Sequence, residues 1–365
     1  MTESSLPIQD YALLSDEECD SRIRAAKEKL GDRCVILGHH YQRDEVFQYA
    51  DLSGDSLKLS RDAAKTDAEF IVFCGVHFMA EGADILSADH QKVILPDLAA
   101  GCSMADMADL AKVERCWREL SEILDADNSI TPVTYINSAA DLKAFCGRHN
   151  GIVCTSSNAR QILEWSFNQR EKILFFPDQH LGRNTGYEMG IPLEEMVIWD
   201  FNKPMGGLTK EEILNARMIL WKGFCSVHQM FRPEQIDNFK AQYPEARVIS
   251  HPESSFEVCQ KSDRLGSTEM ILKIVRESEK GSRWLVGTEL NLVNRLAEEM
   301  KPKGVDVHFM SPTVSMCSTM FRTDPQHLAW VLENLVAGIV VNQITVEAED
   351  AKQAKLALDN MLAVI

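Results

Sequence analysis

The chain has 365 residues, of which 45% are hydrophobic and 25% charged, a balance typical of folded globular proteins that excludes disordered and fibrous classes. Its formal net charge of −17 repels nucleic acid and anionic lipid, so we expect neither as a partner. The apolar runs are far shorter than the roughly 20 residues of a membrane-spanning helix, and the acidic N-terminal segment lacks the basic and apolar regions of a signal sequence, so we expect a cytoplasmic protein.

Short β-rich runs alternate with longer helical patterns, which indicates α/β units built on parallel sheets. The predicted strands, in chain order, are 33–38, 70–76, 92–96, 132–137, 151–155, 172–176, 247–250, 283–287 and 306–310. The predicted helices are 17–30, 55–66, 107–124, 139–146, 158–169, 210–220 and 325–335. No Pro-, Ser- or Gly-rich linker separates these elements, so we expect closely packed α/β domains.

One succession of polar motifs occurs three times along the chain. Each begins with a polar cluster at a strand end, continues with a hydroxyl motif and a second polar strand end, and closes on a loop cysteine. Because ligands of open α/β sheets bind beyond the carboxyl ends of the strands, three such units are able to face one shared centre. The motifs are 39–42, 54–56, 74–77 and Cys102; then 135–137, 155–158, 177–180 and Cys225; then 251–253, 266–268, 287–289 and Cys317.

The 10 cysteines include no CxxC pair, which argues against zinc ribbons and thioredoxin-like sites, and in a cytosolic protein we expect free thiols. Cys102, Cys225 and Cys317 lie in loops at equivalent points of the repeat, whereas the others lie in strands or helical patterns where packing explains them. Three thiolates suit an iron–sulfur cluster with one open iron, which acts as a Lewis acid. A zinc ion held by these cysteines and by His228 or His77 is the alternative.

The hydroxyl motifs around Ser56, Ser156 and Ser267 stand at predicted helix starts. A helix N-terminus offers free N–H groups and the positive end of its dipole to a phosphate or carboxylate. Plain N-capping explains the same residues, and one side chain is able to serve both purposes.

The polar strand ends supply residue types that transfer protons near neutral pH. The His-Pro-Glu sequence at 251–253 is the most suggestive, because a strand end faces the ligand crevice. Nucleotide-binding and serine-hydrolase functions lack support, since the sequence has no GxGxxG after a strand, no P-loop and no GxSxG. The candidates for proton transfer are His39, Tyr41, His228, His251 and Glu253.

A set of longer motifs carries a family resemblance over residues 33–320. The motifs are GHHYQRDEV (38–46), GDSLKLS (54–60), FCGVHFMAEGADIL (73–86), LPDLAAGCSMAD (95–106), YINS (135–138), CTSSNA (154–159), FPDQHLGRNTG (176–186), GFCSVH (223–228), HPE (251–253), GST (266–268) and GTE (287–289). In combination they resemble quinolinate synthase, an iron–sulfur-dependent family.

The resemblance implies an α/β fold of three similar Rossmann-like domains in a pseudo-threefold arrangement around a central active site. We expect these domains at 1–110, 111–232 and 233–365, with the C-terminal helix packing on the first. It also implies a transferase of NAD biosynthesis that condenses iminoaspartate with dihydroxyacetone phosphate to quinolinate, releasing phosphate and water. L-Aspartate oxidase would then be the functional partner that supplies iminoaspartate.

The resemblance further implies a [4Fe-4S] cluster held by Cys102, Cys225 and Cys317, with Cys259 as the fallback for the third ligand. His40 stands where the family usually has Asn, and its direction stays open. The expected catalytic residues are Tyr41, Glu253, His251 and His228. The expected substrate-binding residues are His39, Ser56, Tyr135, Asn137, Ser156, Ser267 and Thr268.

Two other classes of protein remain open at this point. One is another three-cysteine [4Fe-4S] enzyme, a dehydratase or a reductase, which would use the same open iron on a different substrate. The other is a structural zinc protein or an electron carrier, although a carrier normally has four cysteine ligands.

Overall fold

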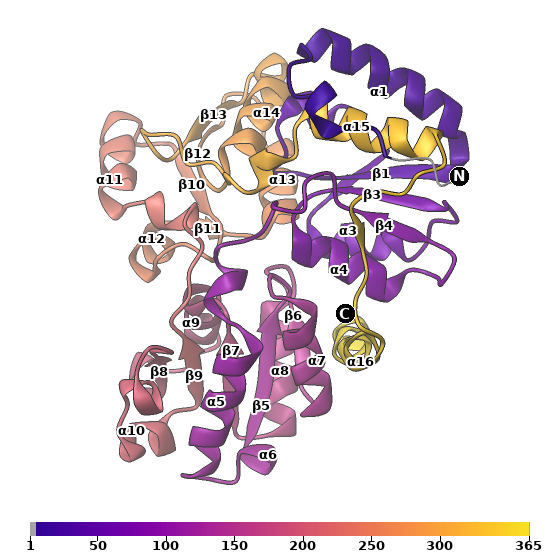
Figure 1. The fold of residues 1–365 in the computed structure, drawn as a ribbon. Helices are drawn as coiled ribbons and strands as arrows, with labels where there is room; N and C mark the ends of the chain where they lie inside the picture. The colour runs from indigo at the N-terminus through magenta and orange to yellow at the C-terminus, as the bar shows by residue number, and fades with distance from the viewer. Residues whose placement is uncertain (1–4, 365) are drawn as a thin grey trace. The chain divides into compact units, whose positions relative to one another are not determined.

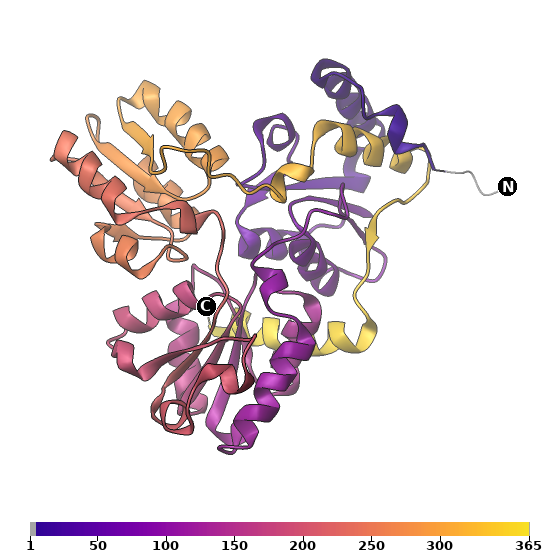
Figure 2. The same ribbon diagram turned by 60° about the vertical axis from the view of Figure 1, so that its left-hand side comes forward.

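The computed structural model describes residues 5–364 (Figures 1 and 2). Residues 1–4 and 365 lie outside the described residues. Residues 1–4 belong to the N-terminal segment in which the sequence predicted no signal sequence. The chain forms two compact units, Met1–Cys102 with Met316–Val346 and Ser103–Ser315 with Glu347–Ile365. Three mostly parallel sheets lie within them, which confirms the predicted α/β fold class. None of the described helices is long and apolar enough to span a membrane.

The first unit holds a five-stranded sheet in the order β14-β4-β3-β1-β2. Its central strand β3 is buried along its whole length, as expected for an apolar run in a parallel sheet. Helices α1 and α15 pack on each other, and α1 starts at a Ser15 capping box. The strands are β1 (Cys34–His39), β2 (Leu52–Gly54), β3 (Phe70–Cys74), β4 (Lys92–Ile94) and β14 (Gln343–Ile344), and the helices α1 (Asp16–Leu30), α2 (Asp44–Phe47), α3 (Ser56–Ala63), α4 (His77–Leu86) and α15 (Pro325–Val336).

The second unit begins with a parallel sheet in the order β6-β5-β7-β9-β8. Its last helix, α16, packs on α7 and β6 and is the yellow helix at the C-terminus in Figure 2. Gly147 in α7 permits this approach, because a Cβ there would lie 2.0 Å from the Gln353 carbonyl oxygen. The strands are β5 (Ile130–Tyr135), β6 (Ile152–Cys154), β7 (Lys172–Phe176), β8 (Met196–Trp199) and β9 (Met218–Trp221), and the helices α5 (Leu110–Ser121), α6 (Ala126–Ser129), α7 (Ala140–Arg148), α8 (Ala159–Gln169), α9 (Gln179–Glu188), α10 (Lys210–Asn215) and α16 (Ala348–Val364).

The second unit also holds a four-stranded parallel sheet in the order β11-β10-β12-β13. Phe231, Val248 and Leu285 belong to the apolar core of this part of the unit. The strands are β10 (Arg247–Ser250), β11 (Arg264–Leu265), β12 (Arg283–Gly287) and β13 (Asp306–Phe309), and the helices α11 (Pro233–Gln242), α12 (Phe256–Lys261), α13 (Thr268–Arg276) and α14 (Leu290–Met300).

The internal repeat predicted from the motifs is present in the sheet topology. In each sheet the first strand of the repeat lies between the second and the third. The fourth strand, β4 or β13, follows the third in two sheets, whereas β9 takes this place in the sheet of β5 and the additional strand β8 lies at its edge. The polar cluster follows the first strand, the hydroxyl motif the second, the second polar end the third, and the loop cysteine the fourth. All of these motifs therefore stand at the carboxyl edges of their sheets, where α/β proteins bind ligands.

Several predicted elements differ from the structure. The helix predicted over 210–220 ends at Asn215, and β9 follows at Met218–Trp221, because a short fully buried apolar run has the same pattern in a helix as in a strand. The helix predicted from 107 begins at Leu110 after the Asp109 N-cap. The predicted elements also did not include the strands β2, β8, β11 and β14 or the helices α2, α4, α9, α11, α12 and α14. The domain boundaries at 110/111 and 232/233 stay predictions.

Candidate active site

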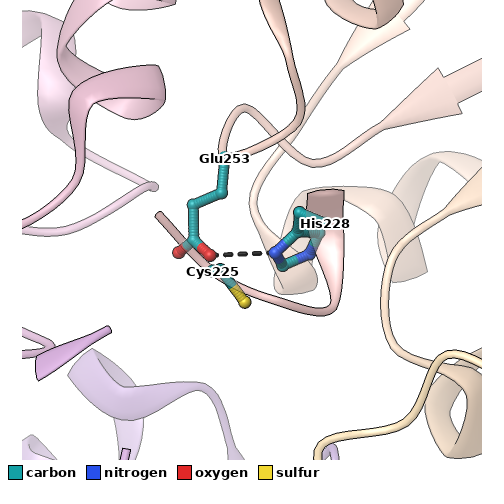
Figure 3. Close-up of side chains that lie close together, drawn as sticks. All are labelled: Cys225, His228 and Glu253. Atoms are coloured by element: carbon teal, nitrogen blue, oxygen red, sulfur yellow. Dashed lines mark ion pairs between the residues drawn. The ribbon is translucent and has the colours of Figure 1, made fainter. Parts of the chain in front are cut away.

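Three buried side chains meet at the carboxyl edges of the two sheets of the second unit. Tyr135 closes β5, and its Oη donates a 2.5 Å hydrogen bond to Oε1 of Glu253, which follows β10. His228 follows β9, and its Nδ1 lies 2.9 Å from the other carboxylate oxygen, Oε2. Figure 3 marks this ion pair with a dashed line. Each of the three is less than a twentieth exposed. Both oxygens of one buried carboxylate therefore face polar partners.

His251 completes this cluster. Its ring stacks on His228 with centroids 4.6 Å apart and planes at 19°. The backbone N–H of Glu253 points at His251 Nδ1 over 3.4 Å, so this nitrogen accepts and the proton of a neutral ring lies on Nε2. Burial lowers the pKa of His251 to about 3, although the Glu253 carboxylate opposes the shift. His251 is therefore a neutral imidazole at physiological pH.

Two carboxyl groups near this cluster have opposite pKa shifts. Burial raises the pKa of Glu253, but the His251 and His228 rings and the Tyr135 hydroxyl outweigh it and bring the pKa to about 2. Burial and the negative charge of Glu253 together raise the pKa of Asp178 well above its ordinary value. The pKa values of the two carboxyl groups are thus shifted in opposite directions, and such a separation is typical of sites that transfer protons.

The loop that carries His251 and Glu253 is fixed from the neighbouring sheet. Asn184 in α9 is 1% exposed, and its Nδ2 donates to the carbonyl oxygens of Pro252 (2.8 Å) and Ser254 (3.0 Å). The same nitrogen lies 3.1 Å from Cys259 Sγ. We did not select Asn184 from the sequence, although it lies within the FPDQHLGRNTG motif. A polar residue on a helix face that is otherwise apolar would have identified Asn184 as a candidate, because buried polar groups need hydrogen-bond partners.

The expected site residues of the first unit stand at the carboxyl edge of its sheet. His39 ends β1, and its Nδ1 accepts from the backbone N–H of Tyr41 over 3.1 Å. The rings of His39 and Tyr41 lie edge to face with centroids 4.8 Å apart. Ser56 is the first residue of α3, whose N-cap is Asp55. The adjacent His40 is buried, and its ring lies 6.0 Å from that of Phe47.

The hydroxyl motifs of the second unit also lie at helix starts, as predicted. Ser267 is the N-cap of α13 and accepts from Met270 N, and Thr268 is the first residue of that helix. Ser156 lies in the half-buried turn before α8, which begins after Asn158. Asn137, two residues after β5, has a buried Oδ1 with no hydrogen-bond partner among the described residues. An unsatisfied acceptor at a strand end is suited to a ligand that donates a hydrogen bond.

The cysteines divide into buried thiols and three loop residues. Burial raises the pKa of Cys19 to about 11 and that of Cys34 to about 12. It also raises the pKa of five others, so these groups stay protonated, whereas metals bind thiolates. The five are Cys74, Cys116, Cys146, Cys154 and Cys259. The three loop cysteines are half-buried and free of disulfides: Cys102, Cys225 and Cys317.

One of the loop cysteines joins the buried cluster. Cys225 Sγ, a ring nitrogen of His228 and a carboxylate oxygen of Glu253 all lie within 4.8 Å of one another (Figure 3). The backbone bond from Gln229 N to Cys225 O winds the segment into one turn, which brings residues three apart to the same side. The second unit thus combines sulfur, nitrogen and oxygen donors that are able to hold a metal ion.

The site combines a buried carboxylate, a phenol and two imidazoles with metal-binding donors at the edge of a parallel sheet. Together with the fold, this combination is typical of an α/β enzyme. Comparison with known proteins narrows this class. The family model "Quinolinate synthetase A protein" matches residues 21–363, and the chain belongs to that family.

Curated relatives match nearly the whole chain. The quinolinate synthase of Acidobacterium capsulatum is 54% identical and covers 98% of this chain and 96% of its own. That of Corynebacterium glutamicum is 55% identical, with coverages of 98% and 90%. That of Herpetosiphon aurantiacus is 56% identical, with coverages of 98% and 95%. The family resemblance drawn from the motifs is confirmed.

Proposed function

We propose that this chain condenses iminoaspartate with dihydroxyacetone phosphate to form quinolinate in NAD biosynthesis. The observation that carries the proposal is the family match over residues 21–363, which includes every residue of the buried Tyr135–His228–Glu253 cluster. The reaction is redox-neutral: one carbon–carbon and one carbon–nitrogen connection form, and phosphate and two waters leave. It therefore needs proton transfer and activation of leaving groups, and no electron acceptor.

The buried cluster is suited to the proton transfers. Condensation requires a base that removes a proton from carbon, and each loss of water requires an acid that protonates a departing hydroxyl. The Glu253 carboxylate accepts protons, and Tyr135 exchanges a proton with it through their hydrogen bond. We also assign His228, whose Nδ1 lies 2.9 Å from the other carboxylate oxygen, to proton transfer. We assign His251 and Tyr41 as the further proton-transfer groups, because both stand at strand ends of equivalent repeats.

Substrate oxygens are proposed to bind at the helix starts and strand ends. Both substrates are anionic, and N–H groups at helix N-termini attract phosphate and carboxylate despite the net charge of −17. The buried Asn137 Oδ1 is suited to a donor group of the substrate. The proposed substrate-binding residues are His39, Ser56, Tyr135, Asn137, Ser156, Ser267 and Thr268.

We assign Cys102, Cys225 and Cys317 as the ligands of a [4Fe-4S] cluster. The donor chemistry fits, because these cysteines lie half-buried in loops, whereas burial holds the other seven as thiols. When bound, the cluster supplies a Lewis acid that polarises a substrate hydroxyl and assists its loss as water. Cys259 is a poor fallback, since its buried thiol points at the Ser254 carbonyl and accepts from Asn184.

The first substrate also constrains the partner and the place of the reaction. Iminoaspartate is an imine that water hydrolyses, so it must be used near its source. We therefore propose L-aspartate oxidase as the enzyme that supplies it, and the cytoplasm as the compartment, where ten free cysteines stay reduced.

Iron and acid-labile sulfide, measured on protein purified without oxygen, test this function together with quinolinate formation. We expect about four of each per chain and product formation from both substrates. Cys225→Ala should lose cluster and turnover together, while Cys259→Ala, the matched control, keeps both. Wild-type turnover in Cys225→Ala would contradict the cluster assignment. An intact cluster without quinolinate would favour another dehydratase.

A further inference from the structure

The sulfur–nitrogen–oxygen group of the second unit brings together donor atoms of three kinds, a set distinct from three cysteines. Cys225, His228 and Glu253 each offer one donor atom, and the three atoms lie within 4.8 Å of one another. Zinc binds at about 2.0–2.3 Å to such donors in a tetrahedron, which separates them by roughly 3.3–3.8 Å. Small side-chain movements therefore suffice to close the group around one ion.

Neighbouring side chains orient two of these donors. Tyr135 Oη occupies Oε1 of Glu253, which leaves Oε2 facing the His228 ring. Thr288 Oγ1 lies 3.4 Å from Nε2 of His228, on the far side of the ring from the carboxylate. The ring is further held by its stacking on His251. Partners of this kind fix the tautomer and direction of metal-binding histidines and carboxylates.

The donor nitrogen lacks a hydrogen bond of its own. His228 is 1% exposed, and its Nδ1 makes no hydrogen bond among the described residues, although Glu253 Oε2 is 2.9 Å away. The approach of Oε2 to Nδ1 therefore lies outside the geometry of a hydrogen bond. A buried nitrogen without a partner, aimed at a carboxylate and a thiol, points to a cation between them.

We propose that the cluster-free protein binds one Zn²⁺ at Cys225, His228 and Glu253, with a fourth position open to water. This donor set lies wholly within the second unit and uses neither Cys102 nor Cys317. Because Cys225 is also an assigned cluster ligand, zinc and the cluster exclude each other, so zinc blocks cluster assembly. This exclusion rests on the proposed function, whereas zinc binding itself does not.

Competition with a chromophoric chelator measures the affinity of the cluster-free full chain for Zn²⁺ alone. We expect one tightly bound ion per chain. The affinity should fall at least about 100-fold in Cys225→Ser and His228→Gln, and about 10–100-fold in Tyr135→Phe, which removes only a supporting hydrogen bond. Cys102→Ser and Cys317→Ser are the matched controls, and both should bind Zn²⁺ as the wild type does.

Co²⁺ alone provides a direct view of the ligands. A sulfur-to-cobalt charge-transfer band, and visible bands of tetrahedral intensity, should be present in the wild type and in Cys102→Ser but absent in Cys225→Ser. Circular dichroism of each variant checks that it is folded. Loss of the ion in Cys102→Ser, or wild-type affinity in His228→Gln, overturns the proposal in favour of a cysteine-only site.

A reconstitution experiment separates this inference from the proposed function. Iron and sulfide are added to the cluster-free chain with and without one equivalent of Zn²⁺, and bound sulfide is measured. Zinc should reduce cluster formation in the wild type, and a chelator should restore it. Full cluster formation with zinc still bound overturns the exclusion. If no cluster forms under either condition, the cluster assignment fails while the zinc measurements stand.

Discussion

The first and third repeats use the same backbone device at the end of their first strand and surround it with different chemistry. The Nδ1 of His39 accepts from the N–H of Tyr41 (3.1 Å), and the Nδ1 of His251 accepts from the N–H of Glu253 (3.4 Å). In both cases the backbone N–H two positions later donates to the histidine ring at the strand end and thereby orients that ring. The residue at that second position is a half-buried phenol in the first repeat and a fully buried carboxylate in the third.

This difference indicates that repeats with the same backbone turn serve different chemical roles. The first repeat places a half-buried Tyr41 edge to face with the buried His39, which suits contact with a substrate. The third repeat surrounds Glu253 with His228, His251 and Tyr135, which suits repeated proton transfer away from water. The two repeats thus share the turn and differ in its side chains.

The largest effect expected from this comparison is that of Glu253→Gln. It removes the charge and the proton acceptor but keeps the shape, so we expect kcat to fall about 10²–10⁴-fold. Tyr41→Phe, the equivalent position of the first repeat, should reduce kcat less. Steady-state kinetics on both variants with iron content matched to the wild type make the test. A larger loss in Tyr41→Phe would assign the main proton transfer to the first repeat.

Asn184→Ala tests whether the loop of the third repeat needs support from the neighbouring sheet. Without the bonds to the Pro252 and Ser254 carbonyls, Glu253 is held less well, so kcat should fall roughly 10-fold and the pH–rate profile should shift. Asn334→Ala is the matched control, a buried asparagine of α15 that bonds Leu6 N and Trp330 O. If both variants lose stability but neither changes the pH profile, Asn184 is merely structural.

The buried histidines of the second unit predict acid sensitivity. Burial lowers the pKa of His180 to about 4, and its Nδ1 has no hydrogen-bond partner among the described residues. The folded state therefore binds fewer protons than the unfolded state as pH falls from about 6.5, so stability falls by roughly 1 kcal/mol per pH unit until about pH 4. His180→Gln should flatten this slope, measured by urea unfolding at several pH values. An unchanged slope would contradict the shift.

The smallest effect concerns the helix starts. Ser267→Ala removes the N-cap of α13 and should cost about 1 kcal/mol of stability. Ser15→Ala removes the N-cap of α1 and should cost a similar amount. Only Ser267→Ala should raise KM, because Ser15 belongs to none of the repeat motifs. Equal KM values in the two variants would show that Ser267 only caps helix α13 and does not bind substrate.

The agreement between sequence and structure is uneven for physical reasons. Strands such as Lys172–Phe176 and Arg247–Ser250 were predicted to the residue, because their apolar runs are bounded by polar or turn residues. The two-residue strands β11 and β14 were missed, since their pairing depends on a neighbouring strand and on no pattern of their own. The helix predicted over 210–220 was wrong beyond Asn215, because the run Met218–Trp221 is buried on all sides and has no period that separates strand from helix.

For the site, the sequence determined which residue types recur at which strand ends, and hence the repeat, the family and the candidate residues. It did so because the order of strands along the chain fixes which edge of a parallel sheet each motif reaches. Only the tertiary structure decided that Glu253 contacts Tyr135 and His228, that Asn184 holds the loop, and that Cys225 shares their donor group. These pairs are 25 to 118 residues apart or lie on different elements, so packing of two sheets brings them together, and no local pattern encodes that packing.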